Sequence, residues 1–181
     1  MNFSIPKEVQ KRLLFIARKT IEDRINGKES VFENDMPELK QQAAVFVTLT
    51  QHGMLRGCIG NITPQSDLLD AVVTMARQAA FSDPRFPPLT EKDLPEVRIE
   101  ISVLSPMQKV RSHNDIEKDV HGVMIKKDFR SGLFLPQVWE HFSSKEDFMN
   151  ELCTQKASLP RDAWKQDNID IFVFTVFKFE E

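Results

Sequence analysis

The hexapeptide of residues 55–60 carries the side chains whose types and spacing point most directly to chemistry. It reads Leu-Arg-Gly-Cys-Ile-Gly, and an apolar strand has no packing reason to hold an arginine and two glycines. On a regular strand alternate side chains share a face, so Arg56 and Cys58 are expected on one face with Cα atoms about 7 Å apart. A neighbouring guanidinium favours the thiolate, the nucleophilic form of cysteine. The hexapeptide therefore predicts a nucleophilic Cys58 assisted by Arg56, with Gly57 and Gly60 permitting close approach to the backbone.

A purely structural role for the thiol is the alternative. Free cysteine is among the most buried residue types, so a lone cysteine in a strand is often a packing residue. Cys153 falls on the apolar side of an expected helix and serves as an internal reference for such a residue. Two cysteines are too few for a disulfide framework, and their spacing from the four histidines fits no zinc motif. We therefore expect no metal site.

Three further side chains are candidates for proton transfer or anion binding. His121 precedes a strand and could act as a base toward a thiol, or could simply satisfy a turn. Glu100 lies on the polar row of an alternating strand and could be a general acid or base, or a cross-strand partner. Arg85 could bind an anion, while Asp83 beside it is expected to cap nearby amides.

Composition and charge exclude several classes of protein. Lys and Arg number 24 against 27 Asp and Glu, a formal net charge of -3, so nucleic acid is an improbable partner. No apolar window reaches the roughly 18 residues that span a bilayer, and no leader pattern precedes the first element, which predicts a cytoplasmic protein without a membrane partner. Phosphate-binding loops, dinucleotide fingerprints and serine-elbow motifs are absent, and nothing in the sequence names a cofactor.

Periodicity predicts the elements that must position these residues. Helical spacing covers residues 6–25 and a second helix from Thr63 to Ser82, with a hairpin of strands 43–50 and 54–59 between them. Residues 97–103 alternate between apolar and polar, as in a strand with one buried face.

The C-terminal half continues this mixture. A smaller hairpin is expected from 122–127 and 133–136 around the loop 128–132, followed by a helix capped by Ser144. Residues 169–179 read as one long central strand. Helices and strands interleave without a steady βαβ rhythm, which predicts an α+β protein with mainly antiparallel sheets.

The hexapeptide resembles the signature of the AMMECR domain family. Further blocks resemble the family in its own order and extend the match from about residue 40 to the C-terminus: 79–86, 99–106, 121–122, 133–138 and 156–160. The sequence departs from the family in two places. Ser158 stands where the family usually has glycine, and the segment between Val138 and Phe148 is short.

The resemblance implies a single AMMECR-type domain over residues 1–181. It implies two unequal lobes, each built on an antiparallel sheet flanked by helices. The larger lobe would contain both termini, the smaller would be inserted, and the hexapeptide would face the cleft between them. It also implies functional association with Memo-like and radical-SAM proteins, without naming a substrate.

Two functional hypotheses remain open from the sequence. In the first, the protein is an enzyme or enzyme subunit in which Cys58 is the nucleophile, Arg56 stabilises the thiolate or binds an anionic group, and His121 or Glu100 moves protons. In the second, it is a non-catalytic adaptor domain that recognises a peptide or small ligand through a groove formed by residues 55–60.

Overall fold

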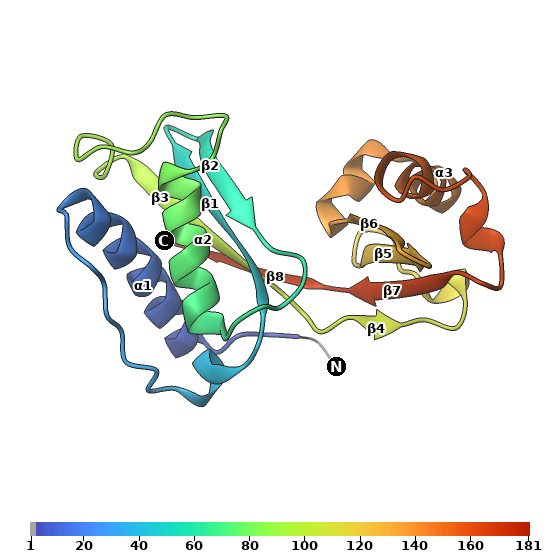
Figure 1. Ribbon diagram of the computed structural model, residues 1–181, viewed down its shortest axis with the longest axis horizontal. Helices are drawn as coiled ribbons and strands as arrows, with labels where there is room; N and C mark the ends of the chain where they lie inside the picture. The colour runs from blue at the N-terminus through green and yellow to red at the C-terminus, as the bar shows by residue number, and fades with distance from the viewer. Residues whose placement is uncertain (1–2) are drawn as a thin grey trace. The chain divides into compact units, whose positions relative to one another are not determined.

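The chain folds into two units, each built on its own four-stranded sheet (Figure 1). The computed structural model describes residues 3–181. Unit 1 takes the chain up to Leu104 together with Phe177–Glu181, and unit 2 is Ser105–Val176. Both sheets are antiparallel and both are accompanied by helices. The α+β class expected from the sequence, with two antiparallel sheets, is confirmed.

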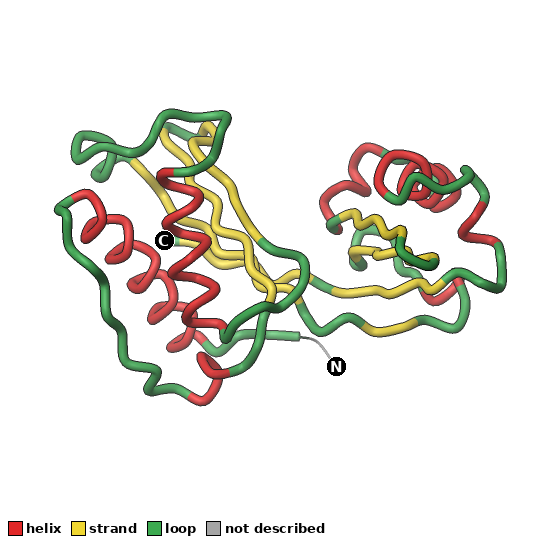
Figure 2. The backbone as a smooth tube through the Cα atoms, in the orientation of Figure 1, coloured by secondary structure: helices red, strands yellow, loops and turns green. Residues whose placement is uncertain are grey.

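Unit 1 combines a sheet of strand order β2-β1-β3-β8 with two helices. Figure 2 shows these helices on one face of that sheet, where α2 contacts both α1 and β1. The apolar rows of β1 and β3 fill the interface between helices and sheet. The elements are α1 (Lys7–Ile25), β1 (Ala44–Gln51), β2 (Met54–Gly60), α2 (Leu68–Phe81), β3 (Val97–Leu104) and β8 (Val176–Glu180).

The face of this sheet opposite α1 and α2 is called here the outer face. On β1, the buried Val45, Val47 and Leu49 alternate with residues that are only half-buried, and β3 follows the same rule up to Glu100. The outer face therefore carries the polar row that the alternation in β3 predicts.

Helix α2 begins later than the sequence predicts. Its N-cap is Asp67, whose side chain accepts a hydrogen bond of 3.0 Å from the amide of Asp70. The expected start at Thr63 is wrong because the aspartate, and not the Thr-Pro pair, satisfies the free amides of the first turn.

Unit 2 places a short helix against a sheet of strand order β4-β7-β5-β6. The predicted Ser144 cap is confirmed, since its Oγ accepts a hydrogen bond of 3.1 Å from the amide of Asp147. The indole of Trp139 stacks on Phe148 at 3.5 Å between ring centroids and helps to form the core. The elements are β4 (Gln108–Lys109), β5 (Gly122–Lys127), β6 (Arg130–Phe134), α3 (Lys145–Glu151), a π-helical continuation (Leu152–Lys156) and β7 (Asp170–Phe174).

The apolar run 169–179 is not the single central strand that its sequence suggests. It forms two strands in different sheets, β7 inside the sheet of unit 2 and β8 at the edge of the sheet of unit 1. The break is at Thr175, whose amide donates to Ser105 Oγ and whose carbonyl accepts from the Ser105 amide, both at 2.9 Å. Periodicity could not reveal this break because the partner lies 70 residues away in sequence.

The turn of the smaller hairpin is also shorter than predicted. Strand β6 already begins at Arg130, so only Asp128 and Phe129 connect it to β5. Asp128 has a positive φ of 54°, a conformation that Asp and Asn adopt more readily than most residues and that suits a two-residue hairpin turn.

Ser158 lies in the left-handed region of backbone space, with φ of 54°. Only glycine adopts this conformation without steric cost, and other residues lose about 1–2 kcal/mol. Ser158→Gly is therefore expected to raise the free energy of unfolding by about 0.5–1 kcal/mol, after allowing for the greater freedom of glycine in the unfolded chain. Urea denaturation followed by circular dichroism measures this gain.

A matched control for this substitution lies in β6. Ser131 is exposed and has no positive φ, so Ser131→Gly is expected to lower stability. If both variants lost stability equally, the backbone of Ser158 would not be the source of strain.

Candidate functional site

A register shift in the β1–β2 hairpin decides where the hexapeptide side chains point. Thr48 pairs with Cys58 and Thr50 pairs with Leu55, so the pairing between β1 and β2 skips a residue and leaves Arg56 in a bulge. Directly paired residues share a face, which places Cys58 and Leu55 on the outer face with the two threonines. The expectation that Arg56 and Cys58 share a face through simple alternation is wrong, because the bulge interrupts that alternation.

The Cys58 thiol lies at one end of a polar row that crosses the larger sheet. Its Sγ is 3.3 Å from Oγ1 of Thr48, a hydrogen bond in which either atom can donate. Thr48 is in turn the register partner of Glu100 on β3. The Glu100 carboxylate lies 3.9 Å from Nζ of Lys178 on β8. The row therefore brings a thiol, a hydroxyl, a carboxylate and an ammonium group onto one face.

Arg56 is occupied away from this row. Its Nη1 donates a hydrogen bond of 2.7 Å to the carbonyl of Pro87, and its Nη2 lies 3.8 Å from the carboxylate of Asp93. Hydrogen bonds from Thr90 to that carboxylate, and to a smaller extent the charge of Arg56, lower the pKa of Asp93. Arg56 thus fastens the loop after α2 to strand β2, a structural task that the sequence does not reveal.

Asp83 and Arg85 cover the free edge of β2 at Cys58. The Cys58 amide donates to Oδ2 of Asp83 at 2.8 Å, and Nη2 of Arg85 donates to the Cys58 carbonyl at 3.1 Å. Because β2 is an edge strand, this pair supplies the acceptor and the donor that a neighbouring strand would otherwise provide. Asp83 does bond the amides of Cys58 and Arg85. The prediction that it caps nearby amides is confirmed.

The contacts that Asp83 and Arg85 make with the free edge of β2 are called here the edge clamp, and Asp83 is its central residue. It is only 4% exposed, and Arg85 also donates to it through its amide, Nε and Nη2. Hydrogen bonding by the Arg85 side chain, followed by that of the Cys58 amide, holds the pKa of Asp83 far below its ordinary value. The positive charge of Arg85 is therefore already neutralised by Asp83, and a role of this arginine in anion binding stays a prediction.

Both glycines of the hexapeptide have steric reasons to be glycine. A Cβ on Gly57 would lie 2.2 Å from the carbonyl oxygen of Ala79 in α2, so the helix can approach β2 only over a bare backbone. A Cβ on Gly60 would lie 2.2 Å from the ring of Phe46, its partner on β1. Close approach was predicted at both positions, and the approaching groups belong to the protein itself.

His121 belongs to unit 2 and has structural partners there. Its Nδ1 accepts a hydrogen bond of 3.0 Å from the amide of Glu117, and its carbonyl accepts one of 2.7 Å from the indole of Trp139. The ring is thus oriented with Nδ1 as acceptor and Nε2 as the remaining nitrogen. Its part in proton transfer toward Cys58 stays a prediction.

Comparison with known proteins places the chain in a family. The sequence model of the AMMECR1 family matches residues 14–179 of this chain. The chain belongs to the AMMECR1 family. Protein PH0010 of Pyrococcus horikoshii is 36% identical over 194 residues, covering 100% of this chain and 94% of that protein. Protein NEQ441 of Nanoarchaeum equitans is 38% identical over 176 residues, covering 92% of this chain and 97% of that protein.

A solved structure confirms the fold of this AMMECR1-family chain. The crystal structure of PH0010, titled as that of an uncharacterized protein, is similar with a TM-score of 0.81 and 35% identity. The similarity covers 99% of this chain and 94% of that one. The relatives thus establish the family and the fold.

The second cysteine of this AMMECR1-family chain provides the expected contrast. Cys153 has no exposed surface, and burial raises the pKa of its thiol, whereas Cys58 is half-buried on the outer face. Within residues 3–181, no cluster of three or more His, Cys, Asp or Glu side chains is placed to hold a metal ion. The same residues contain no helix with the length and apolar character needed to cross a bilayer.

Sequence reasoning missed two members of the outer-face row. Thr48 and Lys178 lie on strands that were expected, but nothing local identifies them as partners of Cys58 and Glu100. The usable signal was the alternation in β1, which puts Thr48 on the side away from the apolar residues. No local signal identifies Lys178, because the apolar run 169–179 predicts one continuous strand in which the separate strand β8 is not apparent.

Proposed function

We propose that the protein is a cysteine-dependent enzyme, or a subunit of one, that uses Cys58 on the outer face as its nucleophile. The observation that carries this proposal is the hydrogen bond between Cys58 Sγ and Thr48 Oγ1 within a row that also holds a carboxylate and an ammonium group. Arg56, Gly57 and Gly60 have packing roles, so the thiol is the chemically distinctive group of the hexapeptide that packing does not explain.

The proposed step is a nucleophilic displacement at an electrophilic carbon of the substrate. Cys58 Sγ forms a bond to that carbon, and the leaving group departs with the electron pair of the bond that breaks. The thiol proton leaves through the hydroxyl of Thr48, which is hydrogen-bonded to Sγ, and passes on to the carboxylate of Glu100, the register partner of Thr48 on β3. The Thr48 hydroxyl orients the sulfur, and Lys178 holds the carboxylate in place through their ion pair.

Glu100 is preferred over His121 as the proton acceptor in this proposal. Glu100 stands on the same sheet as Cys58, two strands away and in register through Thr48. The association with Memo-like and radical-SAM proteins that the family resemblance implies is part of the same proposal, since such partners could supply or consume the modified substrate.

A binding role is the second candidate, and one observation favours it. Met54 and Leu55 are 69% and 44% exposed at the start of β2, and Leu55 shares the outer face with Cys58. Exposed apolar side chains beside a polar row are typical of a contact surface for a peptide or small ligand. In this case Cys58 would be a packing residue beneath the surface.

Alkylation of the two cysteines by iodoacetamide at neutral pH, followed by mass spectrometry, tests the proposal. Cys58 is expected to be labelled at least about tenfold faster than Cys153, because the latter is buried with a raised pKa. Thr48→Val removes the hydroxyl bonded to Cys58 at nearly constant volume, and it is expected to slow labelling of Cys58 severalfold. The matched control is Thr50→Val, on the same face of the same strand, which should leave the rate unchanged.

The labelling rates of Cys58 in the two threonine variants decide between the nucleophile and the binding role. Exposure alone explains why Cys58 reacts faster than Cys153, but it does not explain sensitivity to Thr48. Equal rates in the wild type and in Thr48→Val would remove the nucleophile from this proposal and leave the binding role.

A further inference from the structure

Unit 2 contains a pocket that the proposed cysteine chemistry does not use. Its volume is about 310 Å³, at the lower end of the range for small-molecule sites. The aliphatic residues of its lining are Val110, Ile169 and Ile171. The polar and aromatic lining includes Arg111, His113, Trp164, Lys165, Gln166 and Asp167.

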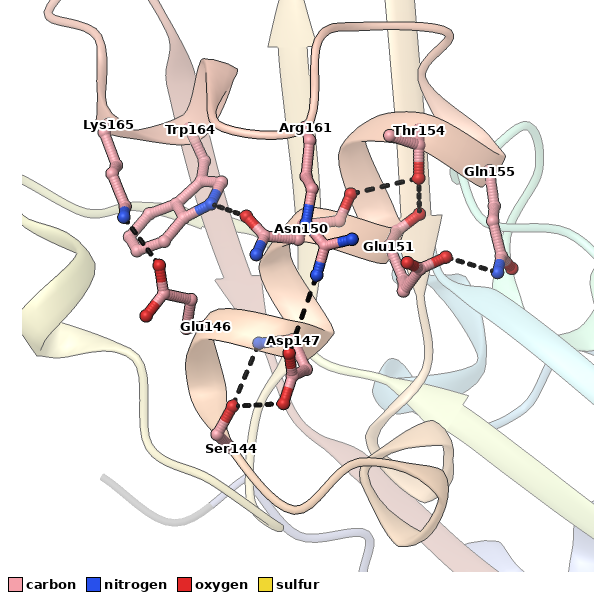
Figure 3. A network of polar contacts seen from close by, with 10 residues as sticks. All are labelled: Ser144, Glu146, Asp147, Asn150, Glu151, Thr154, Gln155, Arg161, Trp164 and Lys165. Carbon is pink, nitrogen blue, oxygen red and sulfur yellow. Dashed lines mark hydrogen bonds and ion pairs between the residues drawn. The ribbon is translucent and has the colours of Figure 1, made fainter.

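Trp164 forms a rigid aromatic wall of this pocket. Its indole nitrogen donates a hydrogen bond of 2.9 Å to Oδ1 of the buried Asn150, as Figure 3 shows. The ring of His113 meets it edge-on at 5.0 Å, and Nζ of Lys165 lies 5.0 Å from its centroid. Trp164 is only 6% exposed and its only donor is already bonded, so it offers a ligand a small aromatic area and no hydrogen bond.

Positive charge gathers at the polar side of the pocket. The guanidinium of Arg111 makes no hydrogen bond or ion pair with any side chain of residues 3–181. Lys145 donates a hydrogen bond of 3.2 Å to the carbonyl of His113, and Lys127 donates one of 2.9 Å to Oε1 of Gln166. Because an ammonium group can only donate, the amide nitrogen of Gln166 is left as a further donor.

Negative charge at the same pocket is smaller. Lys165 is neutralised by Glu146, with 2.7 Å between Nζ and Oε1 (Figure 3). Asp167 contributes one carboxylate to the lining. Asp115 adds a second, since its carboxylate accepts a hydrogen bond of 3.2 Å from the amide of the lining residue Ser112. Against these two carboxylates stand the three charges of Arg111, Lys127 and Lys145, so the balance at the pocket is positive by one charge.

We propose that this pocket binds a small organic anion, with its carboxylate or phosphate on Arg111 and its apolar part between Trp164 and the isoleucines. The planar fork of the free guanidinium can donate two parallel hydrogen bonds to two oxygens of either anionic group. The indole is held in place by its hydrogen bond to Asn150, so this part of the lining needs no rearrangement on binding. This inference is independent of the chemistry proposed for Cys58.

The indole signals of the two tryptophans in a ¹H–¹⁵N spectrum of the full chain test the proposal. Benzoate and phenyl phosphate serve as probes, and benzylamine is the cationic counterpart of the same size. Either anion is expected to shift the Trp164 signal saturably, with a Kd of roughly 1 mM or below. The Trp139 signal is expected not to move, since Trp139 does not line the pocket and its indole nitrogen is bonded to the carbonyl of His121.

Two charge substitutions make the test specific to the pocket. Arg111→Gln is expected to weaken binding of the anion about tenfold, because a charge-assisted hydrogen bond is lost. Lys126→Gln, at an exposed position of β5, should leave the affinity unchanged. Tighter binding of benzoate or of phenyl phosphate tells a carboxylate ligand from a phosphate ligand, and either result supports the proposal.

Three results would overturn the proposal. These are the absence of a saturable Trp164 shift with both anions, binding of benzylamine as tight as that of the anions, and an affinity that Arg111→Gln leaves unchanged while the rest of the spectrum reports a folded chain.

Discussion

Gly57→Ala is expected to lower the free energy of unfolding by about 3 kcal/mol. The added Cβ would lie 2.2 Å from the carbonyl oxygen and 3.1 Å from the carbonyl carbon of Ala79. These are backbone atoms of α2, so no side-chain rotation can relieve the contact and the helix has to move away from β2. Urea denaturation followed by circular dichroism measures the loss.

The same strand offers a control for this substitution. Met54 on β2 is 69% exposed, so Met54→Ala is expected to change stability by no more than about 0.5 kcal/mol. A stable Gly57→Ala variant would show that close helix packing is not the reason for glycine in the hexapeptide. A glycine at position 57 would then favour a role of the hexapeptide in binding.

Local periodicity in the sequence is sufficient to predict the helices and strands that bury one regular face. Helix α1 and strand β3 show it most clearly, because each presents a continuous apolar row to one core. The hairpin of β1 and β2 followed from the turn residues between two apolar runs. Each of these features depends on residues that are neighbours in sequence, which is why the sequence alone predicts them.

The predictions that are wrong concern features that depend on residues distant in the sequence. Strand alternation predicted a shared face for Arg56 and Cys58, but the pairing with β1 skips Arg56 and interrupts that alternation. The division of 169–179 depends on Ser105, far away in the chain. No local pattern encodes either event, so both required the sheet registers.

The candidate site shows the same division. Cys58 and Glu100 were singled out by residue type and by alternation, and both lie on the outer face of one sheet. The partners that give the thiol its setting, Thr48 and Lys178, come from strands whose relation to it is set by pairing. Residue type therefore suggested the chemistry, whereas register determines which groups can take part in it.

Asp83→Asn is expected to destabilise the protein at neutral pH and to lose this effect in acid. The buried carboxylate accepts hydrogen bonds from the Cys58 amide and from three nitrogens of Arg85. An asparagine keeps the shape but places an NH₂ group against one of these donors whichever way it turns. The urea midpoint at pH 7 is expected to fall by about 1 M.

The pH dependence of this difference follows from the lowered pKa of Asp83. A carboxyl group with a lower pKa in the folded state stabilises the fold above its pKa in the unfolded chain, ordinarily 3.8. That stability is lost as the pH falls toward the folded-state pKa. The gap between wild type and Asp83→Asn should thus be constant from pH 7 to about pH 5 and narrow below about pH 4.

A control aspartate separates this effect from general acid sensitivity. Asp128 is exposed at the β5–β6 turn with a positive φ, and asparagine tolerates that conformation equally well. Asp128→Asn is therefore expected to follow the wild-type stability curve at every pH. The stability difference between wild type and Asp83→Asn could instead stay constant down to pH 2. That result would mean that the shape of the Asp83 side chain, and not its negative charge, makes this residue important. In that case the edge clamp would not depend on ionisation, and the environment of Cys58 would remain intact in acid.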